Sequence, residues 1–153
     1  MRIKGNMKKK RVITLILIVL WMGLVFFLSQ QSADESSELS QGLLKIILKI
    51  FKLDSKTEFI TEHIIRKLAH FTLYTLGGML IYLHINLYNT NTKNKVILSH
   101  GIGTIYAITD EIHQIFIPGR SGEIRDVLID SIGVFIGLIF VCIIDMIKKK
   151  EGK

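Results

Sequence analysis

Residues 106–137 hold the most informative pattern in the chain and read Tyr106-Ala-Ile-Thr-Asp110-Glu-Ile-His-Gln-Ile-Phe-Ile-Pro-Gly-Arg120-Ser-Gly-Glu-Ile-Arg-Asp-Val-Leu-Ile-Asp130-Ser-Ile-Gly-Val-Phe-Ile-Gly137. An apolar segment runs into a polar group that begins at Asp110, turns at Pro118-Gly119, and is followed by a second apolar segment that carries Asp126 and Asp130 near its start. A charged side chain in the centre of a bilayer costs about 2.5–3.5 kcal/mol on insertion scales, so such residues are rare and usually functional. If the apolar flanks lie in lipid, these carboxylates indicate a functional site.

The composition favours a membrane protein. The chain has 153 residues, of which 49% are hydrophobic, and a mean hydropathy of +0.41. The apolar residues are gathered into long blocks, as in membrane spans, instead of recurring on one face of each element. A single cysteine, Cys142, excludes a disulfide framework within the chain.

We predict an all-α integral membrane bundle of four transmembrane helices with an extra interfacial amphipathic helix. The predicted spans cover residues 12–28, 68–87, 96–117 and 127–147. A cleaved secretory signal is the alternative for the first span, although its apolar run exceeds the usual length of a signal core. The third span is the most polar, so it requires enclosure by its neighbours. Gly133 and Gly137 give the fourth span a small-xxx-small face for close helix packing.

Two segments lie between the first and second spans. Residues 29–38 are polar and acidic without periodicity, which predicts a loop. Residues 42–53 place Lys45, Lys49 and Lys52 at i, i+4 and i+7 among apolar residues. Such a segment suits an amphipathic helix, either at the headgroup interface or packed against the protein. A new helix is predicted to begin near residue 56.

The basic residues predict the orientation. Of the twenty Lys and Arg residues, twelve lie in the two ends and the 88–95 link, and eight in the segments on the opposite side. Cytoplasmic segments carry an excess of Lys and Arg. We therefore expect a single multi-pass domain of the cell membrane over residues 12–147. Both basic tails, 1–11 and 148–153, should be cytoplasmic, and the turn at 118–125 should face outward.

With this topology the polar residues of three spans and one turn converge in the outer half of the membrane. Positions three, four and seven residues apart share one face of a helix, which brings together those of each span. The candidate ligand-binding residues are Lys67, His70, Tyr74, Asp110, Glu111, Gln114, Arg120, Asp126 and Asp130. For Asp126, a second interpretation is that it caps the start of the fourth span.

Four motifs lie in order along the chain. They are Ser29-Gln-Gln-Ser32, Lys67-Leu-Ala-His-Phe-Thr-Leu-Tyr74, Asp110-Glu-Ile-His-Gln114 followed by Gly119-Arg120, and Asp126-Val-Leu-Ile-Asp130-Ser-Ile-Gly133. In this order and spacing, over roughly residues 12–145, the sequence resembles the VanZ-like membrane proteins. That family is named for an accessory protein linked to low-level teicoplanin resistance. The resemblance implies a membrane protein connected with the cell envelope and with glycopeptide tolerance.

Three hypotheses account for the polar residues. In the first, the protein binds an anionic lipid or a lipid-linked cell-wall precursor, with Lys67 and Arg120 meeting phosphate. In the second, it is an intramembrane hydrolase or transferase acting on a lipid headgroup, with Asp110, Glu111 and His70 as catalytic residues. In the third, it is a proton-coupled transporter, for which so few spans would require a homo-oligomer. A buried network that only fixes helix packing is the structural alternative.

The sequence offers little support for metals, cofactors or nucleic acid. His70 beside carboxylates such as Asp110, Glu111 and Asp130 could ligate a divalent ion. Because no dense motif such as H-E-x-x-H is present, we predict no metal site and assign no cofactor. The Lys-rich ends are explained by membrane topology, so we expect the bilayer, and no nucleic acid, as a partner.

Overall fold

The computed structural model describes residues 2–51 and 58–151, and this part of the chain consists of helices and short connections. The five helices are α1 (Arg2–Ser29), α2 (Ala33–Phe51), α3 (Glu58–Asn86), α4 (Thr92–Gln114) and α5 (Ile124–Glu151). The all-α prediction is confirmed. The predicted helix start near residue 56 lies outside the described residues, as do the last two residues of the predicted amphipathic segment 42–53.

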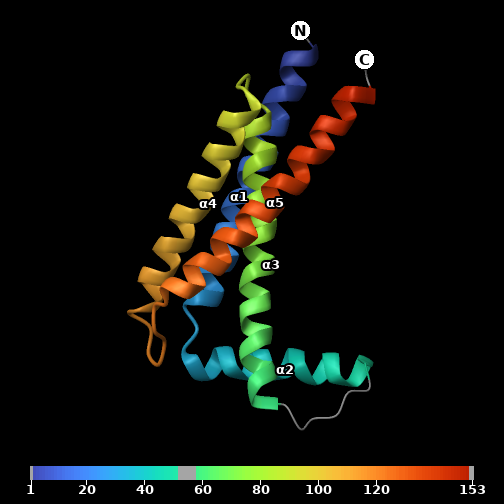
Figure 1. Cartoon of the computed structure of the whole chain (residues 1–153). Helices are drawn as coiled ribbons and strands as arrows, with labels where there is room; N and C mark the ends of the chain where they lie inside the picture. Colours follow the sequence, from blue (N-terminus) through green and yellow to red (C-terminus); the bar gives the residue numbers. More distant parts are fainter. Residues whose placement is uncertain (1, 52–57, 152–153) are drawn as a thin grey trace.

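Four helices, α1, α3, α4 and α5, run lengthwise in one elongated bundle, and α2 lies crosswise at one end of it (Figure 1). The two ends of the chain and the α3–α4 connection lie at the opposite end from α2 (Figure 1). The short connection from α4 to α5 lies at the same end as α2. The molecule therefore has one end with both termini and one end with the turn that the sequence singled out.

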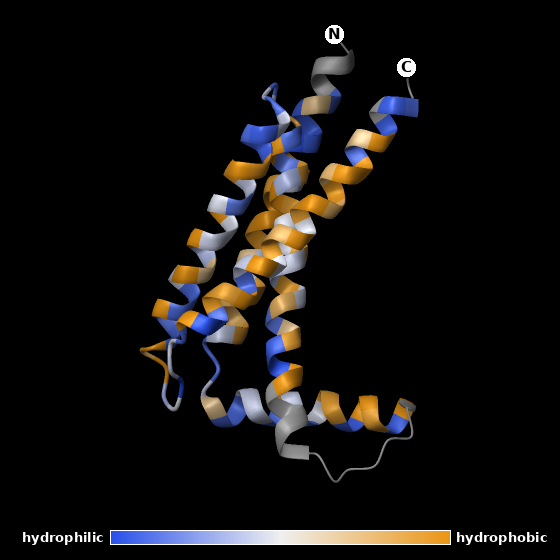
Figure 2. Cartoon of the chain, in the orientation of Figure 1, coloured by the Kyte–Doolittle hydropathy of each residue, from blue (hydrophilic) through white to orange (hydrophobic). Residues whose placement is uncertain are grey.

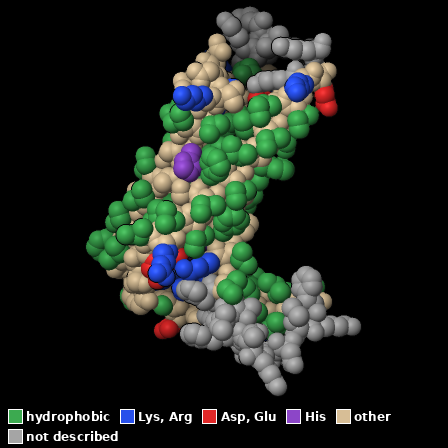
Figure 3. All heavy atoms as spheres, in the orientation of Figure 1, with side chains coloured by type: hydrophobic (Ala, Val, Ile, Leu, Met, Phe, Trp, Pro, Cys, Tyr) green, Lys and Arg blue, Asp and Glu red, His purple; other side chains and the backbone are tan. Residues whose placement is uncertain are grey.

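Three of the described helices are long and apolar enough to cross a membrane. They are the segments Asn6–Ser29, Ile64–Asn86 and Ile124–Lys148. Apolar residues occupy the middle of the bundle and polar residues its ends (Figure 2), and hydrophobic side chains cover much of the flank shown in Figure 3. The third predicted span, 96–117, falls on α4, whose composition does not meet the same criteria.

Glycines let α3 and α5 cross in close contact. A Cβ atom on Gly133 would lie 2.7 Å from the carbonyl oxygen of Phe71, and one on Gly137 would overlap the carbonyl oxygen of Thr75. Gly78 of α3 in turn faces the backbone of Val134. The small residues at these positions allow the two backbones to approach as they do in many membrane helix pairs.

Helix α2 begins earlier than predicted, so the prediction of a loop over 29–38 is wrong from Ala33 onward. The Glu35 carboxylate accepts hydrogen bonds from the Ser32 amide and hydroxyl, both at 2.9 Å, and the Glu35 amide donates to Ser32 Oγ at 3.3 Å. This reciprocal arrangement is a capping box, which stabilises a helix start. The same hydrogen bonds lower the pKa of the Glu35 carboxyl from its ordinary value.

The buried face of α2 consists largely of small polar residues. Ser36, Ser40 and Leu44 follow one another at intervals of four and are buried, whereas Lys45 and Lys49 are exposed. Several large apolar residues of α2 are exposed as well: Leu39, Leu43, Ile46, Ile47 and Ile50. This helix therefore packs on the bundle through its serines and leaves apolar surface uncovered by the described part of the protein.

Candidate functional site

The connection between α4 and α5 is fixed against the junction between α1 and α2. The Ala33 amide donates to the carbonyl oxygen of Pro118 at 3.2 Å. Gly119 has a φ of +73°, a conformation that residues with a Cβ atom adopt at a cost. An added Cβ there would lie 2.9 Å from that of Ala33. The tight turn that brings Arg120 into the site thus requires glycine.

Arg120 reaches from this connection across to the end of α1. Its Nε donates to the carbonyl oxygen of Gln31 and its Nη2 to that of Leu28, both at 3.3 Å. These two acceptors are neutral, so the hydrogen bonds orient the guanidinium without neutralising its charge. Arg120 thereby presents a positive charge at the end of the bundle.

Lys67 of α3 forms the closest ion pair of the site. Its Nζ lies 2.7 Å from Asp126 Oδ1 and 3.9 Å from Glu123 Oε2. Helix α5 begins at Ile124, so Asp126 is its third residue. The interpretation of Asp126 as the cap of this helix is therefore wrong, and its side chain instead joins α5 to α3.

The polar end of α4 is buried and largely paired. Asp110, Glu111 and Gln114 are each 4% exposed. The Gln114 amide donates to Asp110 Oδ2 at 3.2 Å and to Glu111 Oε1 at 3.1 Å, and the Glu123 amide donates to Glu111 Oε2 at 2.9 Å. Glu111 thus holds the start of α5 in place, while Asp110 lies deeper among the helices.

His70, Asp110 and Asp130 come from three different helices and meet below the turn. Asp130 is fully buried, and the Nδ1 atom of His70 lies 3.6 Å from its Oδ2. One potential ligand atom from each of the three residues lies within 4.8 Å of the others. Only the folded bundle brings them together, since forty residues separate His70 from Asp110.

Tyr74 closes the site on the side that faces the middle of the bundle. Its side chain is fully buried, and its ring centroid lies 5.8 Å from that of Trp21 and 6.3 Å from that of Tyr106. The Tyr106 hydroxyl donates to the carbonyl oxygen of Met22 at 2.6 Å. This aromatic layer separates the polar residues from the apolar core beneath them.

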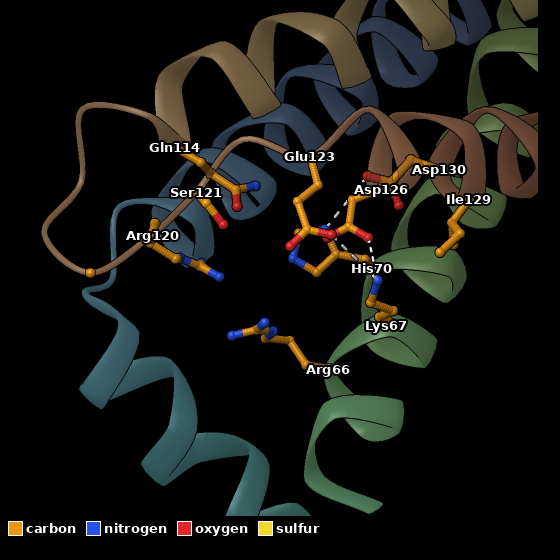
Figure 4. Close-up of a pocket in the computed structure, with 11 residues that line it drawn as sticks. Arg66, Lys67, His70, Gln114, Arg120, Ser121, Glu123, Asp126, Ile129 and Asp130 are labelled. Carbon is orange, nitrogen blue, oxygen red and sulfur yellow. Dashed lines mark hydrogen bonds and ion pairs between the residues drawn. The ribbon is translucent and has the colours of Figure 1, made fainter. Parts of the chain in front are cut away.

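A small polar cavity of about 50 Å³ opens among these residues. It is lined by Arg66, Lys67, His70, Gln114, Gly119, Arg120, Ser121, Glu123, Asp126, Ile129 and Asp130. In Figure 4, Arg66 from α3 and Arg120 from the connection point toward the same opening. A second cavity, of about 260 Å³ and mostly apolar, lies between α1, α2 and α3. Arg66, His70 and Arg120 line both cavities, so the polar and apolar spaces adjoin.

The predicted site residues occupy one end of the bundle, although not all face the cavity. Six of them line it: Lys67, His70, Gln114, Arg120, Asp126 and Asp130. Asp110, Glu111 and Tyr74 are buried behind this lining. Arg66 and Glu123 also line the cavity and were not predicted. Arg66 lies one turn before His70 on α3, a spacing that could have identified it.

A known protein family matches most of the chain. The family described as VanZ/LLP1 matches residues 14–145. No curated protein and no solved structure matches the chain significantly. The matched range contains every residue of the polar cavity, and the resemblance inferred from the four motifs is confirmed.

Proposed function

Because the chain belongs to the VanZ/LLP1 family, we propose that it is a multi-pass protein of the cell membrane that binds an anionic lipid or lipid-linked cell-wall precursor from the outer side. Family membership and three apolar helices indicate a membrane protein. The observation that carries the binding proposal is a polar cavity at one end of the bundle, lined in part by Arg66, Lys67 and Arg120, that adjoins an apolar cavity.

In this proposal α4 also crosses the membrane, in addition to the three apolar helices. Its exposed large residues are apolar and recur along its length: Ile97, Leu98, Ile102, Ile105, Ile108 and Ile112. Its buried face is small or polar, with Ser99, Gly103 and Asp110. At 23 residues α4 is long enough, about 35 Å, to cross the hydrocarbon. The polar face lowers its mean hydropathy but faces the protein, where it is sheltered from lipid.

The orientation follows from the basic ends. Both termini lie at one end of the bundle together with the α3–α4 connection, and these segments contain most of the Lys and Arg residues. The positive-inside rule makes this end cytoplasmic. The polar cavity and α2 then lie on the outer side. The exposed apolar residues of α2 favour a position in the outer headgroup region, along the membrane surface.

The cations of the cavity suit a phosphate group. Arginine binds phosphate in a bidentate geometry, and lysine binds it as a point charge. Arg120 donates to backbone carbonyls in the described structure, so its charge can still attract an anion. Lys67 is paired with Asp126, which holds its ammonium group at the cavity wall. A phosphate at the opening would meet both cations.

The adjoining apolar cavity favours a lipid over a free phosphate ion. It is lined by Val25, Leu28, Leu39, Leu43 and Leu73 in addition to the residues shared with the polar cavity. A headgroup phosphate at Arg120 would therefore have room for part of an acyl or prenyl chain beside α2. An inorganic phosphate would use only the polar part.

Lipid binding tests the proposal directly. Purified protein should bind phosphatidylglycerol more tightly than phosphatidylcholine in native mass spectrometry, and inorganic phosphate should not displace the bound lipid at equal concentration. A hydrogen bond to a charged group contributes about 1.5–3 kcal/mol, so Arg120→Ala should weaken phosphatidylglycerol binding by roughly tenfold or more. Arg125→Ala is the matched control, because Arg125 is exposed and lies outside the cavity lining.

Arg120→Lys separates charge from folding, since it keeps the positive charge while losing the planar guanidinium. We expect it to retain the preference for phosphatidylglycerol, with reduced affinity. Equal binding of the two lipids by the wild-type protein, or unchanged binding in Arg120→Ala, would contradict the proposal.

Glycopeptide tolerance is the proposed consequence in the cell. Lipid-linked precursors and lipoglycopeptides meet at the outer surface, so a protein that binds the lipid there can reduce access of the antibiotic. Expression of the wild-type chain should lower teicoplanin susceptibility, and Arg120→Ala and Glu111→Gln should remove that effect at equal protein levels. Unchanged susceptibility in both variants would argue against this role.

A further inference from the structure

The two buried aspartates at the centre of the site, Asp110 and Asp130, have no lysine or arginine partner among the described residues. Asp110 and Asp130 are 4% and 0% exposed. Among the described residues, the ion pairs at this end of the bundle join Lys67 to Asp126 and Glu123, and His70 to Asp130. No lysine or arginine of the described chain lies within ion-pair distance of either buried aspartate. The carboxylates of Asp110 and Asp130 therefore both lie near a single imidazole, that of His70.

Asp130 is the clearest case of an unsatisfied group. Both of its carboxylate oxygens are buried and make no hydrogen bond within the described residues. The Nδ1 atom of His70 lies 3.6 Å from Asp130 Oδ2, which is longer than a hydrogen bond. Buried carboxylates in proteins are normally paired, hydrogen-bonded or bound to metal ions. Asp130 makes no side-chain hydrogen bond within the described residues, and its ion pair there is with His70, which is charged only when protonated.

The three side chains are arranged as a set of metal ligands. His70, Asp110 and Asp130 project from α3, α4 and α5, and one potential ligand atom from each lies within 4.8 Å of the others. One imidazole and two carboxylates suit Zn²⁺, or Mn²⁺ with its preference for carboxylates, better than Ca²⁺, which prefers oxygen ligands alone. His70 and Asp130 also line the polar cavity, so a bound ion would keep a coordination position open to water.

We propose that His70, Asp110 and Asp130 bind one divalent transition-metal ion, Zn²⁺ or Mn²⁺. The ion balances the charge of the two buried aspartates and links three helices of the bundle. If the lipid-binding proposal also holds, the open coordination position faces the cavity in which the phosphate would lie. Metal binding itself needs no lipid, so the two proposals can be tested apart.

The test uses the full-length protein in detergent, stripped with a chelator and transferred to buffer without phosphate or added lipid. Zn²⁺ retained after desalting is measured by mass spectrometry of the metal, and Mn²⁺ binding by electron paramagnetic resonance. We expect about one ion per chain. His70→Gln and Asp130→Asn should each weaken binding at least tenfold, because each removes a ligand to the metal.

Matched controls lie elsewhere in the same helices or at the same end of the bundle. Asp145→Asn removes a carboxylate of α5 that accepts a hydrogen bond from Asn86. His113→Gln removes a histidine of α4 that stacks on Phe26. Both controls should bind one ion with the affinity of the wild type. The thermal midpoint gives a second readout, since the metal should raise it for the wild type and the controls but not for Asp130→Asn.

Folded wild-type protein that retains neither ion would overturn the proposal, and so would binding that survives both His70→Gln and Asp130→Asn. Lipid binding measured in excess EDTA distinguishes this failure from that of the proposed function. If phosphatidylglycerol binding depends on Arg120 and persists without metal, the lipid-binding proposal is supported. That result holds whether or not an ion binds at His70.

Discussion

At the scale of the residue, Gly119 decides where Arg120 lies. The positive φ of Gly119 and its contact with Ala33 hold the α4–α5 connection against the start of α2. The hydrogen bonds from Arg120 to the end of α1 depend on that placement. One backbone conformation therefore links the geometry of the connection to the charge at the cavity.

Replacing Gly119 with alanine should destabilise the fold. A left-handed conformation costs an L-residue about 1–2 kcal/mol, and the added Cβ would also crowd Ala33. For a chain of this size the thermal midpoint should fall by about 2–8 °C in a fluorescence melt of the purified protein. Gly42→Ala is the control, since nothing lies within 4 Å of its added Cβ. If Gly119→Ala and the wild type have the same thermal midpoint, the backbone at position 119 is not strained by a side chain.

Spacing along the sequence predicted most of the polar residues at this end, because a helix places residues three and four apart on one face. It did not predict the partner of Asp126. The start of α5 at Ile124, instead of the predicted 127, turns Asp126 from a cap into a residue of the first turn that pairs with Lys67. Glu123 was overlooked for the same reason, since its role depends on where α5 begins.

At the scale of the element, α2 and α4 reverse the pattern of helices in soluble proteins. The buried face of α4 carries Ser99, Gly103 and Asp110 while its isoleucines are exposed, and α2 buries Ser36 and Ser40. In lipid there is no penalty for exposing apolar side chains, so the small and polar residues pack inside. Hydropathy alone therefore located the apolar helices but predicted a loop where α2 begins. The Ser32–Glu35 capping box was the signal that could have corrected it.

The crossing of α3 and α5 is the element-scale feature most sensitive to substitution. Gly137→Ala should destabilise the bundle by about 1–3 kcal/mol, because the added Cβ would overlap the backbone of Thr75 and the helices would have to separate. Thermal unfolding in detergent measures this loss. Gly101→Ala on α4, where nothing lies within 4 Å, should cause no loss. Equal midpoints for the two variants would contradict the close crossing.

At the scale of the whole molecule, the polar site lies at one end of an apolar bundle, and the proposed function places that end on the outer side of the membrane. The four predicted spans, the amphipathic segment and the basic tails came from composition and charge counting alone. What these could not provide was the lateral arrangement of the helices, which makes His70, Asp110 and Asp130 neighbours. That arrangement depends on packing between segments far apart in the sequence.

Cysteine labelling in intact cells shows which side of the membrane the polar site faces. The buried Cys142 is first replaced by alanine, and single cysteines are then introduced as Ser121→Cys in the α4–α5 connection and Asn89→Cys in the α3–α4 connection, both at exposed positions. A membrane-impermeant maleimide should label Ser121→Cys in intact cells and Asn89→Cys only after the membrane is permeabilised. Labelling of Asn89→Cys in intact cells, with Ser121→Cys protected until permeabilisation, would contradict an outward-facing site.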